Sequence, residues 1–496
     1  MGDDARVVVI GSGPSGAMAA VTLVEAGIPV TMLESGSARP RGALLRLNGR
    51  TVLRGSVGRA DVSPYVAARG QPTTLLHLRA PGGLSNLWTG AVPRFAPEDF
   101  DEGSRLHERY RWPVSYRELV PYYERVERLL EIAGSRDDAV TLPAGPRPRY
   151  PVRLPQGWNG AARRARELHQ DLIPVPLADG APWMLAARAT AFNSFDRLIA
   201  GLRGRSGFQL LLGAHAHRLE WSALERRVVS VSYIDRAGRA AERLRAAAVI
   251  VAAGPIESTR MLLDSTSAEF PDGLGDRHGI LGRFLHDHPY DVSLVEFDRP
   301  VARLAHTLDL TRQPYATSEP LLAALATFGN PRMGLADRLL NLTPLRTRSL
   351  GLVVLGTVIP SAENRITLDP NQRDDLGISV PVLDVRFDDR AIRNVVAARD
   401  RAATVLEGLG RRCTVRPLVA VHVPGTSTHY GGSVRMHASP EHGMLDGWNR
   451  LHAVPNVLVT DASAFTTGPE KNPTLTAMAL AARAAERLAK DLRRGQ

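Results

Sequence analysis

The first 34 residues contain the feature that most constrains the fold. The segment RVVVIGSGPSGAMAAVTLVEAGIPVTMLESG predicts a strand over 6–10, a helix over 14–25 and a second strand over 29–34. A glycine-rich turn joins the first strand to the helix at the G-x-G-x-x-G spacing. A strand, turn, helix and strand in this order are typical of a dinucleotide-binding βαβ unit. We therefore predict an α/β fold with a parallel sheet.

Each residue of this turn has a separate task. Gly11 permits the tight turn, Gly13 allows the backbone to approach a pyrophosphate, and Gly16 allows the helix and strand to pack closely. Pro14 and Ser15 open the helix, where free N–H groups and the positive end of the helix dipole attract phosphate. These five residues are candidate cofactor contacts.

Glu34 ends the second strand, 18 residues after Gly16. An acid at this place hydrogen-bonds the adenosine ribose, and it disfavours the 2′-phosphate of NADP. We expect Glu34 to bind the ribose. This stretch alone leaves NAD and FAD open.

Composition limits the other possibilities. The 496 residues are enough for two domains, and the formal charge is +11. Only Lys471 and Lys490 are lysines, so 62 − 2 = 60 of the basic residues are arginines, and they are spread along the chain. Nucleic-acid binding requires a clustered basic footprint, so we expect none. Cys413 is the only cysteine, which excludes an intrachain disulfide and any cysteine-based zinc, iron–sulfur or haem site.

The N-terminus has acids followed by a predicted strand, and no run of 18 apolar residues occurs. Signal peptides and membrane spans have other patterns. We expect no membrane association and a cytoplasmic protein.

A second glycine-rich loop occurs in APGGLSNLWTGAVPRF. Gly83 allows close backbone approach, and Ser85, Asn86 and Thr89 are candidate hydrogen-bond partners of a polar ring. The alternative is a plain surface loop, which the apolar content of the segment disfavours.

Two later strands end at candidate cofactor contacts. A buried strand is predicted to end at Gly254, and another runs into Asp461. After a loop, Asn472 and Pro473 are predicted to begin a long helix, with Asn472 as N-cap and Pro473 as first residue. Capping alone is the structural alternative for Asn472.

The segment STHYGGSVRMH contains His429 and His437, which are candidates for metal ligands, a catalytic base or packing residues. A metal site from His429, His437 and His442 lacks paired acidic or cysteine ligands, so we expect no metal. A lone histidine is most often structural, and the local pattern leaves catalysis open. Arg435 is predicted to form a buried ion pair.

These segments, in this order, resemble the glucose–methanol–choline (GMC) oxidoreductases, which are FAD enzymes that oxidise alcohols. The matching motifs span nearly the whole chain: GSGPSGAMAA, GGLSNLWTGAVPRF, VAAGPIESTRMLL, LGRFLHDHP, SAENRITLDP, STHYGGSVRM and NPTLTAMALAARAAE. The loop with WTGAVPRF and the NPTLTAM segment are most similar to the pyranose-oxidase branch. The resemblance implies an FAD-binding Rossmann-like domain of GMC type joined to a mixed-sheet α+β substrate domain.

The resemblance also implies roles for single residues. His429 would face the flavin ring as catalytic base, and Asn472 would occupy the second active-site position, with Thr474 beside the cofactor. His217 occupies the adenine-contacting position. Leu87 replaces the histidine that links flavin covalently in the branch, so we expect non-covalent FAD. The HDH of residues 286–288 would be structural.

This assignment agrees with the chemistry of alcohol oxidation. The hydroxyl proton must leave while hydride passes from the carbinol carbon to flavin N5, and imidazole has an ordinary pKa near 6.5, so it is available as a neutral base. The Asn472 amide would orient the substrate oxygen without competing for the proton. A helix start at this point would also stabilise the negative charge of a reduced flavin.

The expected organisation follows the family. Residues 296–424 would form the substrate domain, with helices at 320–342 and 390–408, and 296–350 is a candidate lid or subunit contact, with ordinary core helices as the alternative. The expected FAD-binding domain is discontinuous (1–100, 200–295 and 425–496), and 101–199 would supply connecting helices and a linker.

We therefore expect FAD-dependent oxidation of an alcohol, on a sugar, an aminoglycoside-like or another polyhydroxylated metabolite. Electrons would pass to oxygen, a quinone or another acceptor. The alternatives are a lyase on the same scaffold, as in hydroxynitrile cleavage, and a flavin-holding subunit without catalysis. The sequence leaves the oligomeric state open.

Overall fold

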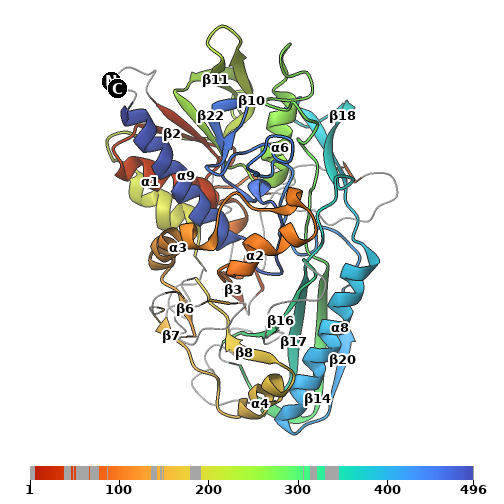
Figure 1. The fold of residues 1–496 in the computed structure, drawn as a ribbon. Helices are drawn as coiled ribbons and strands as arrows, with labels where there is room; N and C mark the ends of the chain where they lie inside the picture. The colour runs from red at the N-terminus through yellow and green to blue at the C-terminus, as the bar shows by residue number, and fades with distance from the viewer. Residues whose placement is uncertain are drawn as a thin grey trace.

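The computed structural model describes residues 6–37, 46–47, 50–51, 66–67, 78–86, 88–135, 142–143, 145, 148, 150–178, 192–304, 306–312, 321–329, 346–419 and 421–494. In Figure 1, one half of the molecule holds both chain ends and the paired helices α1 and α9, and the other half holds the long strands β14 and β17 beside helix α8. Segments from the start, middle and end of the chain meet in the first half.

The first half is built on a six-stranded sheet in the order β21-β22-β13-β1-β2-β9. Every neighbouring pair is parallel except β21 and β22. Strands β1, β2 and β13 are buried throughout, as apolar runs in parallel sheets usually are. The bounds are Val7–Ile10 for β1, Val30–Glu34 for β2, Phe208–Leu212 for β9, Ala248–Val251 for β13, Arg450–Leu451 for β21 and Val454–Val459 for β22.

Two helices pack together on this sheet. Helix α1 spans Pro14–Glu25, as predicted, and it contacts β1, β2 and β13. Helix α9 spans Thr474–Arg494 and lies beside α1 (Figure 1). One face of this helix is fully buried, with the side chains of Leu475, Met478, Ala479, Ala482 and Ala485.

Further elements surround this layer. Helix α3 (Tyr116–Leu130) contacts α9 and begins with a capping box, in which Ser115 and Glu118 exchange hydrogen bonds. Helix α6 (Pro255–Asp264) starts at Pro255, just after Gly254. The remaining elements are α2 (Pro97–Asp101), an antiparallel sheet of β10 (Ala214–Ser222), β11 (Arg227–Asp235) and β12 (Ala240–Arg245), and the short strands β3 (Arg46–Leu47), β4 (Arg50–Thr51), β6 (Ala133–Gly134) and β7 (Tyr150–Pro151).

The second half is a six-stranded sheet in the order β20-β14-β17-β16-β15-β8, in which the neighbours are antiparallel. Helix α8 (Asp389–Leu406) confirms the helix predicted at 390–408, and it packs on this sheet with α4 (Asn159–Glu167). The strand bounds are Gln170–Pro174 for β8, Tyr290–Ala302 for β14, Leu308–Arg312 for β15, Ala324–Gly329 for β16, Arg346–Gly356 for β17 and Cys413–Pro417 for β20. A smaller sheet joins β18 (Arg365–Arg373), β19 (Ser379–Asp384) and β5 (Val66–Ala67).

The helix predicted over 320–342 is wrong where the structure describes the segment, because β16 occupies 324–329 there. Leu325, Ala326 and Phe328 are buried between β15 and β17. Burial in the sheet thus overrides the local helix preference of leucine and alanine. In the candidate lid, the described residues of 296–350 lie in β14, β15, β16 and β17 or directly beside them, and residues 305, 313–320 and 330–345 lie outside the described residues.

The domain division remains a prediction. The first sheet draws its strands from the three segments assigned to the FAD-binding domain. However, β8 of the second sheet comes from 101–199, and β14 crosses the boundary at 295. Within the described part of the chain, no helix has the length and apolar content needed to cross a membrane.

Candidate functional site

The glycine turn after β1 is closely packed on one side and open on the other. Gly11 has φ +98°, and a Cβ there would lie 2.4 Å from the Ala252 carbonyl oxygen. A Cβ on Gly16 would lie 2.0 Å from the Gly11 oxygen. A Cβ on Gly13 would meet no atom within 4 Å. The turn therefore has the tight helix–strand contact and the open face that a pyrophosphate requires.

The start of α1 borders this open face. Gly13 is the N-cap without a side-chain hydrogen bond, Pro14 is half-buried, and Ser15 is buried. The first N–H groups of a helix have no partner within the helix, so they are donors for an anion at this position. The donors fit a phosphate group.

Glu34 ties the end of β2 to the glycine turn. Its Oε2 accepts hydrogen bonds from the amide of Ser12 at 3.0 Å and from Ser12 Oγ at 2.5 Å, and its Oε1 accepts from the Gly36 amide at 2.7 Å. Burial raises the pKa of Glu34 above its ordinary value. Since a carboxylate has about four acceptor positions, three donors leave room for one ribose hydroxyl.

The second glycine-rich loop lies against the first. The amide of Gly82 donates to Ser12 Oγ at 2.9 Å, and a Cβ on Gly83 would lie 3.6 Å from the Cα of Gly13. These contacts bring residues 82–83 to the open face of the dinucleotide turn. The interpretation as an unrelated surface loop therefore loses its support.

The polar side chains of this loop bind within the protein. Ser85 Oγ donates to the Gly82 carbonyl at 2.6 Å, and Asn86 Nδ2 donates to the Pro81 carbonyl at 3.0 Å. Asn193 Nδ2 donates to Asn86 Oδ1 at 2.8 Å. Ser85 and Asn86 thus shape the loop, and their contact with a cofactor stays a prediction. Thr89 is exposed, and Leu87 lies outside the described residues.

Sequence reasoning missed the segment that supports this loop. Ser194 Oγ donates to the Ser12 carbonyl at 2.9 Å, and its amide donates to Ser85 Oγ at 3.1 Å. Asn193 and Ser194 are more than 100 residues from the loop in sequence and belong to no motif, so no local signal could identify them. His217 is half-buried on β10, and its adenine contact stays a prediction.

Asp461 connects the first sheet, through Gly254 after β13, to the segment that contains His429. Its Oδ2 accepts from the Gly254 amide at 3.0 Å and from Ser258 Oγ at 2.5 Å, and its Oδ1 accepts from the Ser463 amide at 2.9 Å. Burial raises its pKa. The amide of Val434 in turn donates to the Ser463 carbonyl at 3.0 Å. Gly254 has φ +89°, and a Cβ there would meet no atom within 4 Å.

His429 and Asn472 are in direct contact. Asn472 Nδ2 lies 3.1 Å from His429 Nε2, although 43 residues separate them. His429 Nδ1 is buried and has no hydrogen-bond partner in the described structure. Burial, and then the neighbouring His288, lower the pKa of His429 well below 6.5. The ring is therefore neutral at and below neutral pH, with one nitrogen facing the Asn472 amide.

The predicted cap at Asn472 is wrong by one position. Helix α9 begins at Thr474, and the Pro473 carbonyl accepts from the Ala477 amide at 3.0 Å. Pro473 is therefore the N-cap, and Asn472 precedes it. The Asn472 side chain is directed to His429 instead of the helix amides. Thr474 is half-buried at the helix start.

Asp287 fixes the backbone that carries His429. Its carboxylate accepts from the Gly425 amide at 2.8 Å, from the Ser427 hydroxyl, and from the His429 amide at 3.0 Å. The family resemblance implies a structural role for residues 286–288. These hydrogen bonds show that Asp287 holds the backbone of the segment 425–429.

The two flanking histidines complete this support. His286 pairs with Gly431 through two backbone hydrogen bonds, and a Cβ on Gly431 or Gly468 would lie 2.4–2.5 Å from its ring. His288 donates from Nδ1 to the Gly356 carbonyl at 2.8 Å. Its ring meets that of His429 edge to face, with centroids 5.2 Å apart.

His437, a candidate metal ligand or catalytic residue from the sequence, contacts backbone groups in the structure. His437 binds the backbone of Glu108 and Ser439 through its two ring nitrogens. In the described residues, no cluster of histidine, cysteine, aspartate or glutamate is suited to hold a metal ion.

The predicted ion pair of Arg435 is not found among the described residues. Arg435 instead stacks on Phe284, with its guanidinium carbon 4.3 Å from the ring centroid, and on Tyr110, and it donates to the Arg109 carbonyl. Aromatic faces thus replace the expected carboxylate.

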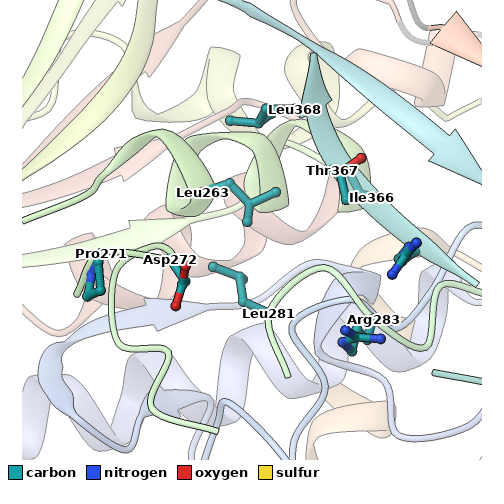
Figure 2. A pocket seen from close by; sticks show the side chains of 9 residues that line it. Leu263, Pro271, Asp272, Leu281, Arg283, Ile366, Thr367 and Leu368 are labelled. Atoms are coloured by element: carbon teal, nitrogen blue, oxygen red, sulfur yellow. The ribbon is translucent and has the colours of Figure 1, made fainter. Parts of the chain in front are cut away.

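A separate cavity of about 240 Å³ opens between α6, β18 and the segment before β14 (Figure 2). Leucine side chains face its centre, and Arg283 lies at one end in Figure 2. It is lined by Leu263, Pro271, Asp272, Leu281, Arg283, Arg365, Ile366, Thr367 and Leu368. No residue assigned to the cofactor or to catalysis lines it, so we do not include it in the site.

Comparison with known proteins gives two family matches. A family model described as GMC oxidoreductase matches residues 360–481, and one described as an FAD binding domain matches residues 4–51. The first match includes His429 and Asn472, and the second includes the glycine turn and Glu34.

Two characterised proteins are similar over nearly their full length. Paromamine 6′-oxidase from Streptomyces fradiae is 30% identical over 520 residues, covering 99% of this chain and 93% of that protein. 6‴-Hydroxyparomomycin C oxidase from Streptomyces lividus is 30% identical over 525 residues, covering 98% and 91%. The crystal structure of pyridoxine 4-oxidase from Mesorbium loti has a TM-score of 0.67 at 19% identity, covering 97% of this chain and 98% of that one, and it supports the fold alone.

Proposed function

Since this chain belongs to the GMC oxidoreductase family, whose members oxidise CH–OH groups with FAD, we propose that His429 and Asn472 are its catalytic pair. The observation that supports this most is the contact of 3.1 Å between His429 Nε2 and Asn472 Nδ2. The two side chains are 43 residues apart in sequence and meet at one point. The hydrogen bonds of Asp461 connect this region to Gly254, which follows β13 of the first sheet.

The pair suits a substrate hydroxyl, which both donates and accepts. A hydroxyl oxygen about 2.8–3.0 Å from both atoms would donate its proton to His429 Nε2 and accept from Asn472 Nδ2. His429 would then take the hydroxyl proton, and the Asn472 amide would hold the oxygen in place. When bound, FAD supplies the acceptor for the hydride that leaves the carbinol carbon.

The pKa of His429 supports its role as base. Because burial lowers this pKa well below 6.5, the ring remains unprotonated in mildly acidic solution. The base form is lost only when the pH falls through the lowered value. No carboxylate among the described residues contacts Nδ1, so none raises the basicity of the ring.

The proposed FAD contacts come from several separate segments of the chain. Gly11, Gly13, Pro14, Ser15 and Gly16 would bind the pyrophosphate and Glu34 the ribose. Gly83, Ser85, Asn86 and Thr89, His217, Gly254, Asp461 and Thr474 would contact the remaining parts. We infer non-covalent attachment, because the family branch uses a histidine where this chain has Leu87. Acid precipitation should release all flavin into the supernatant.

We infer that the substrate is an aminoglycoside-like compound, a sugar or another polyhydroxylated metabolite. The support comes from the names of the two relatives at 30% identity, an oxidase of paromamine and one of a hydroxylated paromomycin. The electron acceptor would be oxygen, a quinone or another oxidant that reacts with the flavin directly. With a single cysteine, the chain has no cysteine-bound metal cluster that could carry electrons away from the flavin.

The proposal is tested by flavin absorbance under anaerobic conditions. The purified protein is mixed with paromamine, 6‴-hydroxyparomomycin C and a panel of sugars and polyols. We expect the flavin to lose its yellow colour with at least one alcohol and to regain it when air or a quinone is added. Product formation with the flavin still yellow would favour the lyase alternative, and no reaction across the panel would favour a non-catalytic flavin subunit.

A further inference from the structure

A fully buried ion cluster lies next to the proposed catalytic pair. The Lys471 side chain has 0% exposure, and its Nζ lies 2.9 Å from Asp99 Oδ2 and 2.8 Å from Glu470 Oε1. Both carboxylate side chains are at most 4% exposed. The two carboxylates raise the pKa of Lys471, so the ammonium is charged. We call Asp99, Glu470 and Lys471 the ion triad.

The identity of the basic residue is itself informative. The chain has 60 arginines and two lysines, and the other lysine, Lys490, is 58% exposed. An ammonium is a compact charge with three donors, whereas a guanidinium is a planar fork that requires more space. At position 471, one carboxylate comes from the adjacent residue Glu470 and the other from Asp99 on α2, and the compact ammonium of lysine fits between them.

The position of Lys471 connects both histidines of the site. The next residue, Asn472, contacts His429 Nε2. The backbone of Lys471 is hydrogen-bonded to His288, whose ring lies edge to face against His429. Asp99 belongs to α2, a helix of a different segment, where its Oδ2 also accepts from the Ala96 amide at 2.6 Å. The ammonium therefore joins the loop of Asn472 to α2.

The rest of this loop has its own attachments. Thr466 Oγ1 donates to the Met436 carbonyl at 2.7 Å, and Trp112 Nε1 donates to Thr467 Oγ1 at 2.7 Å. Gly468 pairs with Val358 and packs on His286. These contacts attach the loop as far as residue 468, and the ion triad and the backbone bond to His288 add attachments at residues 470 and 471, just before Asn472.

We propose that Lys471 is a positioning residue for catalysis, which acts by fixing the Asn472 amide against His429. This inference rests on the proposed function, because it assigns Lys471 a task in the same site. Since a displacement of about 1 Å in a catalytic group can lower a rate about 10²-fold, loss of the triad should slow the hydroxyl chemistry.

The test removes the triad without leaving a buried charge unpaired. The triple variant Asp99→Asn/Glu470→Gln/Lys471→Met replaces all three charges by neutral groups of similar size. The single variant Lys471→Arg keeps the charge but changes the donor geometry. The matched control is Glu118→Gln/Arg483→Met, which removes an ion pair between α3 and α9, 2.8 Å long, that does not touch residues 470–472.

Two readouts are measured on the FAD-loaded proteins. The first is hydrogen exchange of the backbone amides of 466–473, followed by mass spectrometry, together with the Asn472–His429 distance in a crystal structure. The second is the rate of flavin reduction by the best alcohol. For the triple variant and Lys471→Arg, we expect faster exchange in this loop and a flavin reduction rate lower by about 10²-fold, with KM changed less than kcat. The control should keep the wild-type values.

Either unchanged readout would overturn the proposal. Wild-type exchange in the triple variant would show that other contacts hold the loop, and a wild-type reduction rate would show that the triad has no role in catalysis. If the wild-type protein itself reduces no flavin with any alcohol, the proposed function fails. The exchange and the distance would then still decide whether Lys471 positions Asn472.

Discussion

At the scale of single residues, the orientation of His429 depends on its backbone. Its Nδ1 has no hydrogen-bond partner among the described residues, so no acceptor orients the ring from that side. The Asp287 carboxylate instead holds three donors of the segment 425–429, including the His429 amide. The ring is then limited by Asn472 on one side and His288 on the other.

We predict that Asp287→Asn slows flavin reduction by about 10-fold or more, because misplaced catalytic groups lose rate steeply. Asparagine replaces one acceptor oxygen with an NH₂ donor, and a hydrogen bond to a charged group contributes about 1.5–3 kcal/mol. The melting temperature and the rate of reduction are measured together.

Asp446→Asn is the matched control, because Asp446 also caps a turn by accepting from two backbone amides, Trp448 at 2.7 Å and Arg450 at 3.0 Å. It should lower the melting temperature and leave the rate unchanged. Equal rates in Asp287→Asn and the wild type would contradict the positioning role.

The family motifs indicate His429 and Asn472 as candidates for the site, but no motif indicates the residues that support them. Asn472 is predicted both as a helix cap and as an active-site residue, and the cap is wrong, because Pro473 is the cap and the Asn472 amide faces His429. Asp99 is 372 residues from Lys471, so no local pattern could indicate that they form a pair. Contacts of this kind depend on the tertiary fold.

At the scale of elements, the glycines of the G-x-G-x-x-G turn meet two different requirements, which are tight helix–strand packing and space for a ligand. Gly16 is needed for packing, because a Cβ there would lie 2.0 Å from the Gly11 oxygen. Gly13 has no such neighbour, so its lack of a side chain matters only for a ligand on the open face. The two functions can therefore be separated by mutation.

We predict that Gly16→Ala destabilises the protein without cofactor, whereas Gly13→Ala leaves its melting temperature unchanged and weakens FAD binding. Thermal melts are recorded without FAD, and FAD affinity is measured by fluorescence titration. Gly201→Ala is the control, because a Cβ there would also meet no atom within 4 Å and the residue belongs to no motif. Wild-type FAD affinity in Gly13→Ala would exclude a pyrophosphate on this face.

Sequence patterns within one segment predict the helices whose ends and apolar faces are determined by that segment itself. The helices predicted over 14–25 and 390–408 are confirmed. The helix predicted over 320–342 is wrong at 324–329, because that segment pairs with a strand on each side in the second sheet. A short apolar run does not reveal which partner will bury it.

At the scale of the whole molecule, the site depends on both halves. His288 binds the Gly356 carbonyl at the end of β17, in the second sheet, and its ring touches His429. Asp461 connects the His429 segment to Gly254, beside the first sheet. The family resemblance predicted these two sheets and the fold class, but only the three-dimensional structure shows that these contacts link them.

The central claim is that His429 removes the substrate proton during FAD-dependent alcohol oxidation. The most direct measurement is the rate of flavin reduction in a single anaerobic turnover, compared between the wild type and His429→Ala at equal FAD content. We predict that the variant binds FAD and is slower by about 10²–10⁴-fold. The wild-type rate should stay constant as the pH falls from neutral to just below 6.5, because the lowered pKa keeps His429 unprotonated there. An unchanged rate in His429→Ala would contradict the account.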